Sequence, residues 1–239
     1  MKKKTVVITG GANGIGASIA KLFAIKKYNV VIIDNDLSSI NKIDDNNIFC
    51  YYADISSESQ ISCVIYDIHK KFDYIDVLIN NAAKQVVSSF DDINYCDWTR
   101  VVDINLNGTF LVIKNAINFM HEKSTILNIL SVHHDKPRLD KYSYDVTKAA
   151  VAMLTKEFAL EFSNRGITIN ALSFGAVNTN MNRDWINNIE IAHNVLSKVP
   201  LCKIFEPEEI ASFAYTIIND FSLYTTGSIF TIDAGRSLM

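Results

Sequence analysis

The sequence is poor in the features that mark cross-linked, membrane-spanning or nucleic-acid-binding proteins. It has only four cysteines and three prolines among 239 residues, and no two cysteines are spaced as CxxC. This excludes a disulfide scaffold and a zinc site built on paired cysteines. No apolar run approaches the length of a membrane span. The net charge of −3 leaves no basic excess to attract nucleic acid or an anionic membrane.

Two further absences bear on the compartment. The basic start of the chain is followed by an apolar run at residues 6–8 that is too short for a secretory signal. Three of the four cysteines lie among apolar neighbours, so we expect mainly small buried thiols in a reducing environment; the four are Cys50, Cys63, Cys96 and Cys202. Together these features predict a soluble, cytoplasmic protein.

What the chain does contain is a regular alternation of apolar strands and helical patterns. The hydrophobic fraction of 49% is enough for one large core. The predicted strands cover residues 5–9, 29–34, 48–53, 75–80, 125–131, 167–173 and 228–232. The predicted helices cover residues 15–25, 57–72 (with Ser56 or Ser57 as N-cap), 97–120, 142–164 and 206–220. Since the strands are continuous apolar runs, we expect an α/β fold: one doubly wound parallel sheet of about seven strands with helices on both faces.

No linker, repeat or change of composition divides the chain, so residues 1–239 are predicted to form a single domain. The least regular stretch is residues 176–203, which is rich in asparagine. A long irregular segment in a compact domain is often a substrate lid. A solvated surface helix is the alternative.

The segment TGGANGIG at residues 9–16 lies between the first predicted strand and the first predicted helix. Gly10, Gly14 and Gly16 permit a tight turn and allow a pyrophosphate to approach the helix N-terminus, where free amides favour negative charge. In this strand–turn–helix context the pattern indicates a Rossmann-type dinucleotide site rather than a merely structural turn.

Asp34 ends the second predicted strand. A carboxylate there can accept hydrogen bonds from both ribose hydroxyls of adenosine and would repel a 2′-phosphate. Gly11 and Asn35 supply no compensating cation, so NAD is favoured over NADP. The alternative is that Asp34 caps the segment that follows it.

Tyr144 and Lys148 are four residues apart at the start of a long predicted helix and therefore share a face. An ammonium nearby favours the phenolate and lowers the pKa of a tyrosine, which suits it to exchange a proton with an alcohol or ketone. Ser131 ends the fifth predicted strand and can hydrogen-bond the same substrate oxygen. A solvated helix face is the alternative for Tyr144 and Lys148 alone.

Together these residues resemble the short-chain dehydrogenase/reductase family over essentially the whole chain. The glycine loop resembles the family's TGxxxGxG, and Asn80-Asn81-Ala82-Ala83 resembles its NNAG. The resemblance implies Asn105, Ser131, Tyr144 and Lys148 as the catalytic set, with Asn105 holding a water in a proton relay. It implies a homo-oligomer, either tetramer or dimer. Phe174 replaces the proline of the family's PGxVxT segment. The implied cofactor residues are Gly10, Asn13, Gly14, Ile15, Gly16, Asp34, Asp54, Ile55, Asn81, Ala82, Tyr144, Lys148, Val177 and Thr179.

The substrate is indicated more weakly. Gln85, His133 and Lys141 offer an amide, an imidazole and an ammonium beside Ser131 and Tyr144, which suits a small carboxylate. Their spacing resembles that of D-3-hydroxybutyrate dehydrogenases, and we expect these five residues to bind a short 3-hydroxy acid. Sugar dehydrogenases of the family also carry Ser-Val-His, and no counterpart of the hydroxybutyrate lid residues follows Gly175. The alternative is that Lys141, His133 and His134 are solvated loop residues.

Other functions are left open. A sugar or polyol dehydrogenase and an NADPH-linked 3-oxoacyl reductase are alternatives of the same class. A non-catalytic NAD-binding sensor or scaffold is an alternative of another class. His133-His134-Asp135 has no third histidine or cysteine cluster near it in the sequence, so we expect no metal site.

Overall fold

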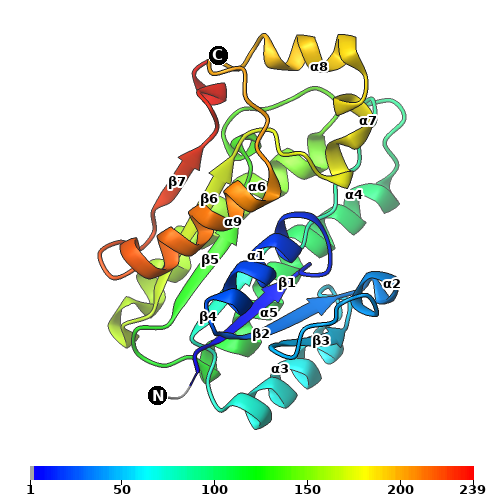
Figure 1. The fold of residues 1–239 in the computed structure, drawn as a ribbon. Coiled ribbons are helices and arrows are strands. Elements are labelled where there is room, and N and C mark those ends of the chain that lie inside the picture. The colour runs from blue at the N-terminus through cyan, green and yellow to red at the C-terminus, as the bar shows by residue number, and fades with distance from the viewer. Residues whose placement is uncertain (1–2) are drawn as a thin grey trace.

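The computed structural model describes residues 3–239, and within them a single seven-stranded parallel sheet has the order β3-β2-β1-β4-β5-β6-β7 (Figure 1). This confirms the predicted Rossmann-type doubly wound fold. The strands are β1 Thr5–Thr9, β2 Asn29–Asp34, β3 Ile48–Tyr52, β4 Val77–Asn80, β5 Thr125–Ile129, β6 Thr168–Phe174 and β7 Ile229–Ile232.

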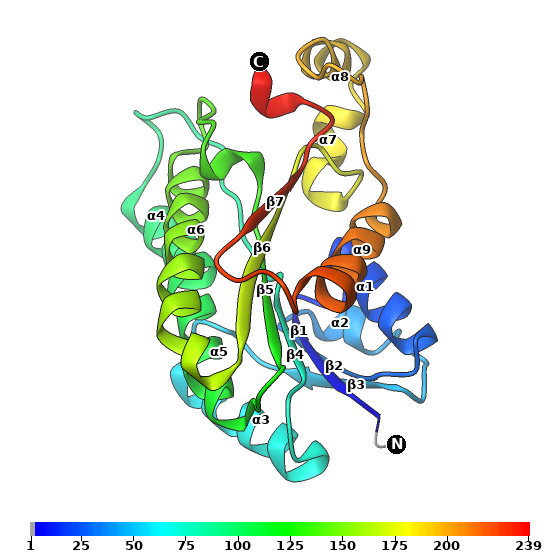
Figure 2. The ribbon, with the colours of Figure 1, turned by 90° about the vertical axis from the view of Figure 1, so that its left-hand side faces the viewer.

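Helices cover both faces of the sheet (Figure 2). Helices α1 and α9 pack on one face, and α3, α5 and α6 on the other. The bounds are α1 Gly14–Ile25, α2 Leu37–Ile40, α3 Glu58–Phe72, α4 Tyr95–Val102, α5 Thr109–Ala116, α6 Tyr142–Phe162, α7 Arg183–Ile186, α8 Ile189–Leu196 and α9 Pro207–Thr216.

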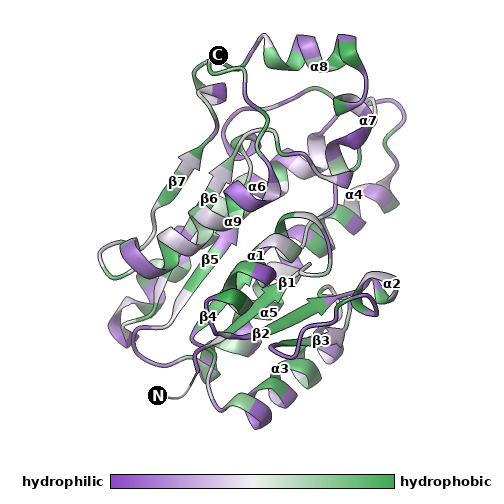
Figure 3. Ribbon diagram, viewed as in Figure 1, coloured by the Kyte–Doolittle hydropathy of each residue, from purple (hydrophilic) through white to green (hydrophobic). Residues whose placement is uncertain are grey.

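The strands carry apolar side chains on both faces because each face is covered by helices. Val6 and Ile8 of β1 belong to the core under α1 and α9, whereas Val7 between them belongs to the core under α3 and α5. Figure 3 shows the corresponding hydrophobic colouring of β1 and β2. This double burial is why the sequence shows continuous apolar runs rather than an alternating pattern.

Three predicted helices differ in detail from the structure. The helix expected at residues 206–220 ends as α9 at Thr216 and continues as a π-helical turn at Ile217–Phe221. The long helix expected at residues 97–120 begins at Tyr95, where the Asn94 side chain accepts a hydrogen bond from Asp97 N, and a π-helical turn at Asp103–Gly108 divides it into α4 and α5. Ser57 is the N-cap of α3 by position, but its hydroxyl makes no capping hydrogen bond.

The segment at residues 176–203 is more regular than expected. It contains the short helices α7 and α8, which lie above the carboxyl ends of β6 and β7 in Figure 2. The prediction of mainly buried cysteines was wrong. Cys50 is half-buried, and Cys63, Cys96 and Cys202 are exposed because they lie on outward helix faces and in a surface turn.

All strands are parallel, so their carboxyl ends meet at one edge of the sheet. The chain order reverses between β1 and β4, and a crevice at such a switch point is where open α/β sheets bind ligands. Within residues 3–239, no helix is long and apolar enough to cross a membrane.

Candidate active site

Two adjoining cavities open at this edge of the sheet. The first has a volume of about 450 Å³ and lies over the ends of β1, β2 and β4. The second has a volume of about 130 Å³ and lies over the ends of β5 and β6. The cavities share four lining residues, which makes them parts of one continuous site: Ile15, Ala83, Thr179 and Met181.

The glycine loop forms the floor of the first cavity. Gly10 has a φ of +63°, and a Cβ there would lie 2.7 Å from Ala82 Cα. A Cβ on Gly16 would lie 2.1 Å from the Gly10 carbonyl oxygen. Asn81 braces the loop, since its Nδ2 donates to Thr9 O at 3.1 Å and to Gly10 O at 2.8 Å. Only glycine therefore fits at position 16, against the Gly10 carbonyl, and at position 10, against the segment that follows β4.

Two carboxylates stand at the β2 end of this cavity. Asp34 accepts hydrogen bonds from Ala12 N at 2.9 Å and from Asp36 N at 3.0 Å, and each of its oxygens retains a further lone pair. Asp36, which sequence reasoning missed, is the N-cap of α2, so Asp34 is not. Hydrogen bonds from Ser38, Ser39 and Asn13 hold the pKa of Asp36 well below its usual range. The cavity thus presents a strongly acidic end.

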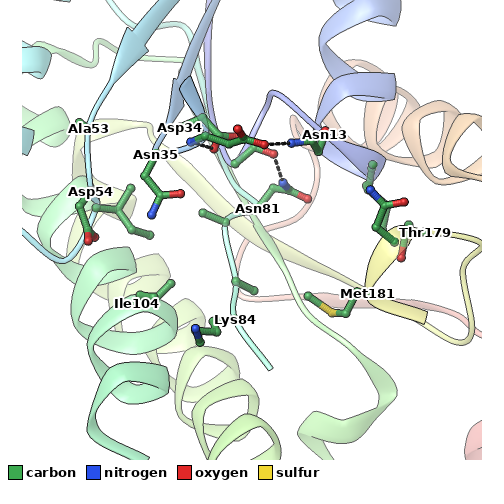
Figure 4. A pocket seen from close by; sticks show the side chains of 18 of the residues that line it. Asn13, Asp34, Asn35, Ala53, Asp54, Asn81, Lys84, Ile104, Thr179 and Met181 are labelled. Atoms are coloured by element: carbon green, nitrogen blue, oxygen red, sulfur yellow. Dashed lines mark hydrogen bonds between the residues drawn. The ribbon is translucent and has the colours of Figure 1, made fainter. Parts of the chain in front are cut away.

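Most of the expected cofactor residues line the first cavity. Figure 4 shows Asn13, Asp34 and Asn81 near one another, with Asp54 on one side and Thr179 and Met181 on the other. Gly16 lies beneath the loop, whereas Val177, Tyr144 and Lys148 line the second cavity. The expected residues in the first cavity are Gly10, Asn13, Gly14, Ile15, Asp34, Asp54, Ile55, Asn81, Ala82 and Thr179. Lining residues that sequence reasoning did not assign to the cofactor are Asn35, Asp36, Ala53, Ala83, Lys84, Arg100, Ile104, Asn180 and Met181.

Tyr144 and Ser131 meet in the second cavity. Burial raises the pKa of Tyr144 to about 12, the hydrogen bond with Ser131 lowers it, and the charge of Asp145 raises it. This differs from the expectation that Lys148 depresses the pKa of Tyr144. The reason is that the loss of solvation outweighs the other influences in this buried site. The protein by itself keeps the phenol protonated at neutral pH.

Lys148 is buried one turn further along α6. Its Nζ donates to Ile129 O at 2.7 Å and lies 5.6 Å from the centre of the Tyr144 ring. Burial lowers the pKa of Lys148 to about 8. The solvated-face alternative for Tyr144 and Lys148 is wrong, because both side chains are at most 8% exposed.

Asn105 is buried in the π-helical turn and lines neither cavity. Its Oδ1 accepts from Lys84 N at 2.7 Å, and its Nδ2 donates to Lys84 O at 2.9 Å and to Thr147 Oγ1 at 3.0 Å. Thr147 Oγ1 in turn donates to Tyr144 O at 2.8 Å. The Asn105 amide therefore ties the chain after β4 to the first turn of α6, and its side chain is bonded to protein groups.

The residues expected to bind substrate also come together in the second cavity. Lys141 Nζ donates to Gln85 Oε1 at 2.7 Å, and burial lowers the pKa of Lys141 to about 8. Burial lowers the pKa of His133 to about 4, so its imidazole is neutral at pH 7. His134 binds Ser131 O through Nδ1 at 2.8 Å. The alternative of solvated loop residues is therefore wrong for these three side chains.

Sequence reasoning missed two arginines of this cavity. Arg138 precedes α6 and Arg236 follows β7, and both line the second cavity together with Trp185 of α7. Arg236 is 95 residues from Lys141 in the sequence, and no short motif links them. Only the fold brings them to one place. Among the described residues, no group of three His, Cys, Asp or Glu side chains is arranged to hold a metal ion.

Comparison with known proteins agrees with this geometry. A family model described as enoyl-(acyl carrier protein) reductase matches residues 10–237. Glucose 1-dehydrogenase 2 of Bacillus subtilis (strain 168) is 33% identical over 247 residues, which cover 98% of this chain and 95% of the relative. The chain belongs to the short-chain dehydrogenase/reductase family. It is thus an oxidoreductase acting on CH–OH groups with a nicotinamide cofactor.

Solved structures of the short-chain dehydrogenase/reductase family share the whole fold. ElxO, solved with NADP bound, has a TM-score of 0.93 and 30% identity, with 99% of this chain and 100% of the other covered. The 3-ketoacyl-(acyl-carrier-protein) reductase of Brucella melitensis, solved with NADH, has a TM-score of 0.88 and 25% identity, with 98% of each chain covered. The two structures hold different cofactors, NADP and NADH, so neither cofactor is transferred directly to this chain.

Proposed function

We propose that the protein transfers hydride between NAD(H) and a small secondary alcohol or ketone, with Tyr144 as the acid and base. One observation carries this proposal. Tyr144 and Ser131 line a small cavity that shares four lining residues with a larger one, which the glycine loop also lines. A substrate carbon in the small cavity would then lie next to a nicotinamide held in the larger one.

The residues present fit a nicotinamide dinucleotide. Without side chains, Gly10 packs against Ala82 and Gly16 packs against the Gly10 carbonyl, so the N-terminus of α1 at Gly14 lines the cavity, where free amides favour a pyrophosphate. When bound, the nicotinamide supplies or accepts the hydride. Tyr144 gives its proton to the carbonyl oxygen during reduction and takes it back during oxidation, while Ser131 hydrogen-bonds the same oxygen. Lys148 places a positive charge near the phenol, and Asn105 holds the first turn of α6.

We propose NAD rather than NADP as the cofactor because of the acidic end of the first cavity. Asp34 and Asp36 both line it, and a 2′-phosphate there would meet two carboxylates. Asn35 between them brings no cation. The NADPH-linked 3-oxoacyl reductase alternative is less well supported for the same reason.

A short 3-hydroxy acid is the substrate that the second cavity supports best. It is small, and its lining includes the cations Arg138, Lys141 and Arg236 and the amide of Gln85. These groups match a carboxylate. A sugar or polyol, as the name of the Bacillus subtilis relative implies for that protein, is the second candidate, since Gln85 and neutral His133 also bind hydroxyls. A non-catalytic sensor has less support, because the catalytic set is complete.

The segment at residues 176–203 is proposed as a substrate lid, since four of its side chains line the second cavity: Asn182, Trp185, Val195 and Val199.

A homo-oligomer is proposed from the family resemblance and from exposed apolar side chains on α6: Val146, Met153 and Leu160. Light scattering on the purified protein measures this, and a monomer would contradict it.

The function is tested by following absorbance at 340 nm with NAD⁺ and with NADP⁺. The substrates are 3-hydroxybutyrate, other short hydroxy acids, sugars and polyols. We expect NADH formation with 3-hydroxybutyrate. Activity on an uncharged sugar without activity on 3-hydroxybutyrate would remove the hydroxy-acid proposal, a preference for NADP⁺ would reverse the choice of cofactor, and cofactor binding without any turnover would favour the sensor.

A further inference from the structure

The charge lining the second cavity is one-sided. Four cationic side chains line it, and within the described residues no carboxylate does: the four are Arg138, Lys141, Lys148 and Arg236. The nearby carboxylate of Asp145 is not part of the lining, and its Oδ2 accepts from Arg138 N at 2.7 Å. The cavity is therefore electropositive toward anything that enters it.

The four cations differ in how free they are to bind a ligand. Lys148 Nζ is directed to the carbonyl of Ile129, and Lys141 Nζ donates one of its three hydrogens to Gln85. Arg138 is exposed. Arg236 is half-buried, and among residues 3–239 its guanidinium makes one hydrogen bond, from Nη1 to Lys198 O at 3.0 Å. Four of its five N–H donors therefore remain for a ligand.

The turn that carries Arg236 is held firmly. Asp233 accepts hydrogen bonds from Gly235 N at 2.9 Å and from Ser237 N at 2.6 Å. Gly235 has a φ of +84°, and a Cβ there would lie 2.8 Å from Pro200 Cγ. Asp233 thus binds backbone amides rather than the guanidinium. A positioned guanidinium loses less conformational freedom when it binds a carboxylate, and it can do so with two parallel hydrogen bonds.

We propose that Arg236 is a specificity-determining residue that binds the anionic group of the substrate, together with Lys141. This inference rests on the proposed function, and it goes beyond it by assigning substrate recognition to the turn after β7. The residues of this anion site come from separate parts of the chain: Gln85 after β4, which accepts a hydrogen bond from Lys141, Lys141 before α6, and Arg236 after β7. Arg236 also donates a hydrogen bond to Lys198 O of the lid segment, so the residue that binds the anion also contacts the lid.

The test compares 3-hydroxybutyrate with 3-hydroxybutyramide, which has the same shape without the charge. In Arg236→Gln, we expect the KM for the acid to rise at least about tenfold, with kcat little changed and the KM for the amide unaltered. Arg236→Lys retains the charge and should keep most of the preference for the acid. Arg165→Gln, at an exposed arginine between α6 and β6 that lines neither cavity, is the matched control and should change neither KM.

A purely structural role for Arg236 predicts that the KM values of acid and amide rise together, and that result would overturn the proposal, as would no change in either. A second readout does not depend on turnover. Calorimetry should show that malonate binds the wild-type protein better than malonamide and that Arg236→Gln removes most of this difference. If the wild type prefers malonate to malonamide but does not oxidise 3-hydroxybutyrate, the anion site stands and the proposed substrate is wrong. Equal binding of malonate and malonamide to the wild type would overturn the anion site.

Discussion

At the scale of single residues, burial favours the neutral forms of the two central side chains. It raises the pKa of Tyr144 to about 12 and lowers the pKa of Lys148 to about 8. A protonated phenol next to Ser131 is the form that donates a proton to a ketone oxygen. The residues of this pair were predictable from spacing and strand position. Their electrostatics were not, because desolvation depends on the packed surroundings rather than on sequence separation.

Replacing Tyr144 with Phe removes the proton donor and leaves the ring in place. We expect turnover of a verified substrate to fall by about 10²- to 10⁴-fold, measured at 340 nm, with NADH affinity close to wild type. Tyr142→Phe is the matched control, since Tyr142 begins the same helix but lines neither cavity. Near wild-type turnover in Tyr144→Phe would show that the assigned role is wrong.

Lys141 makes acid recognition depend on pH. Burial and the charge of Arg138 lower its pKa to about 8, while Asp145 raises it. The charged form, which attracts a carboxylate, is present below that pKa and is lost as the pH rises through it. We therefore expect the KM for 3-hydroxybutyrate to rise between pH 7 and pH 9, by up to about tenfold per pH unit above the pKa.

The KM for 3-hydroxybutyramide is the control for this profile, because titration of Lys148 affects both substrates alike. His133, with a pKa of about 4, stays neutral throughout the range. Lys141→Arg should flatten the acid profile. Parallel profiles for acid and amide would mean that Lys141 does not bind the carboxylate.

At the scale of elements, the glycine loop keeps its shape because its glycines carry no side chain. A Cβ on Gly16 would lie 2.1 Å from Gly10 O, so α1 or the loop must move in Gly16→Ala. We expect NADH affinity to fall at least about tenfold, or about 1.4 kcal/mol, by equilibrium titration. In Gly227→Ala the new Cβ meets only Ala159 Cβ at 3.5 Å, and the φ of +73° should cost about 1–2 kcal/mol of stability without changing NADH affinity. Unchanged NADH affinity in Gly16→Ala would show that cofactor binding does not depend on the shape of the glycine loop.

The elements themselves were largely predictable, and the departures have physical causes. The bounds of β1 and β2 agree with the predicted ranges because both strands are buried on both faces and their apolar runs are unbroken. The π-helical turn at Asp103–Gly108 was not predictable from spacing. It occurs where Gly108 passes so close to Ile55 that a Cβ would lie 2.8 Å from that side chain. Helices α7 and α8 were hidden by an asparagine-rich composition typical of loops.

At the scale of the whole molecule, the parallel sheet assembles the site from distant segments. The cofactor cavity follows recognisable motifs at β1, β2 and β4, so most of its lining could be listed from sequence. The substrate cavity combines Gln85, Lys141, Trp185 and Arg236, which share no motif and meet only because the strand ends lie at one edge. Arg138 and Arg236 were therefore missed.

The measurement that tests the central claim most directly is a crystal structure with NAD bound. The account predicts the adenosine ribose on Asp34, the pyrophosphate over the glycine loop, and the nicotinamide at the wall between the two cavities with the Tyr144 hydroxyl facing its reactive carbon. A nicotinamide ring bound elsewhere, or a Tyr144 hydroxyl out of reach of it, would contradict the account.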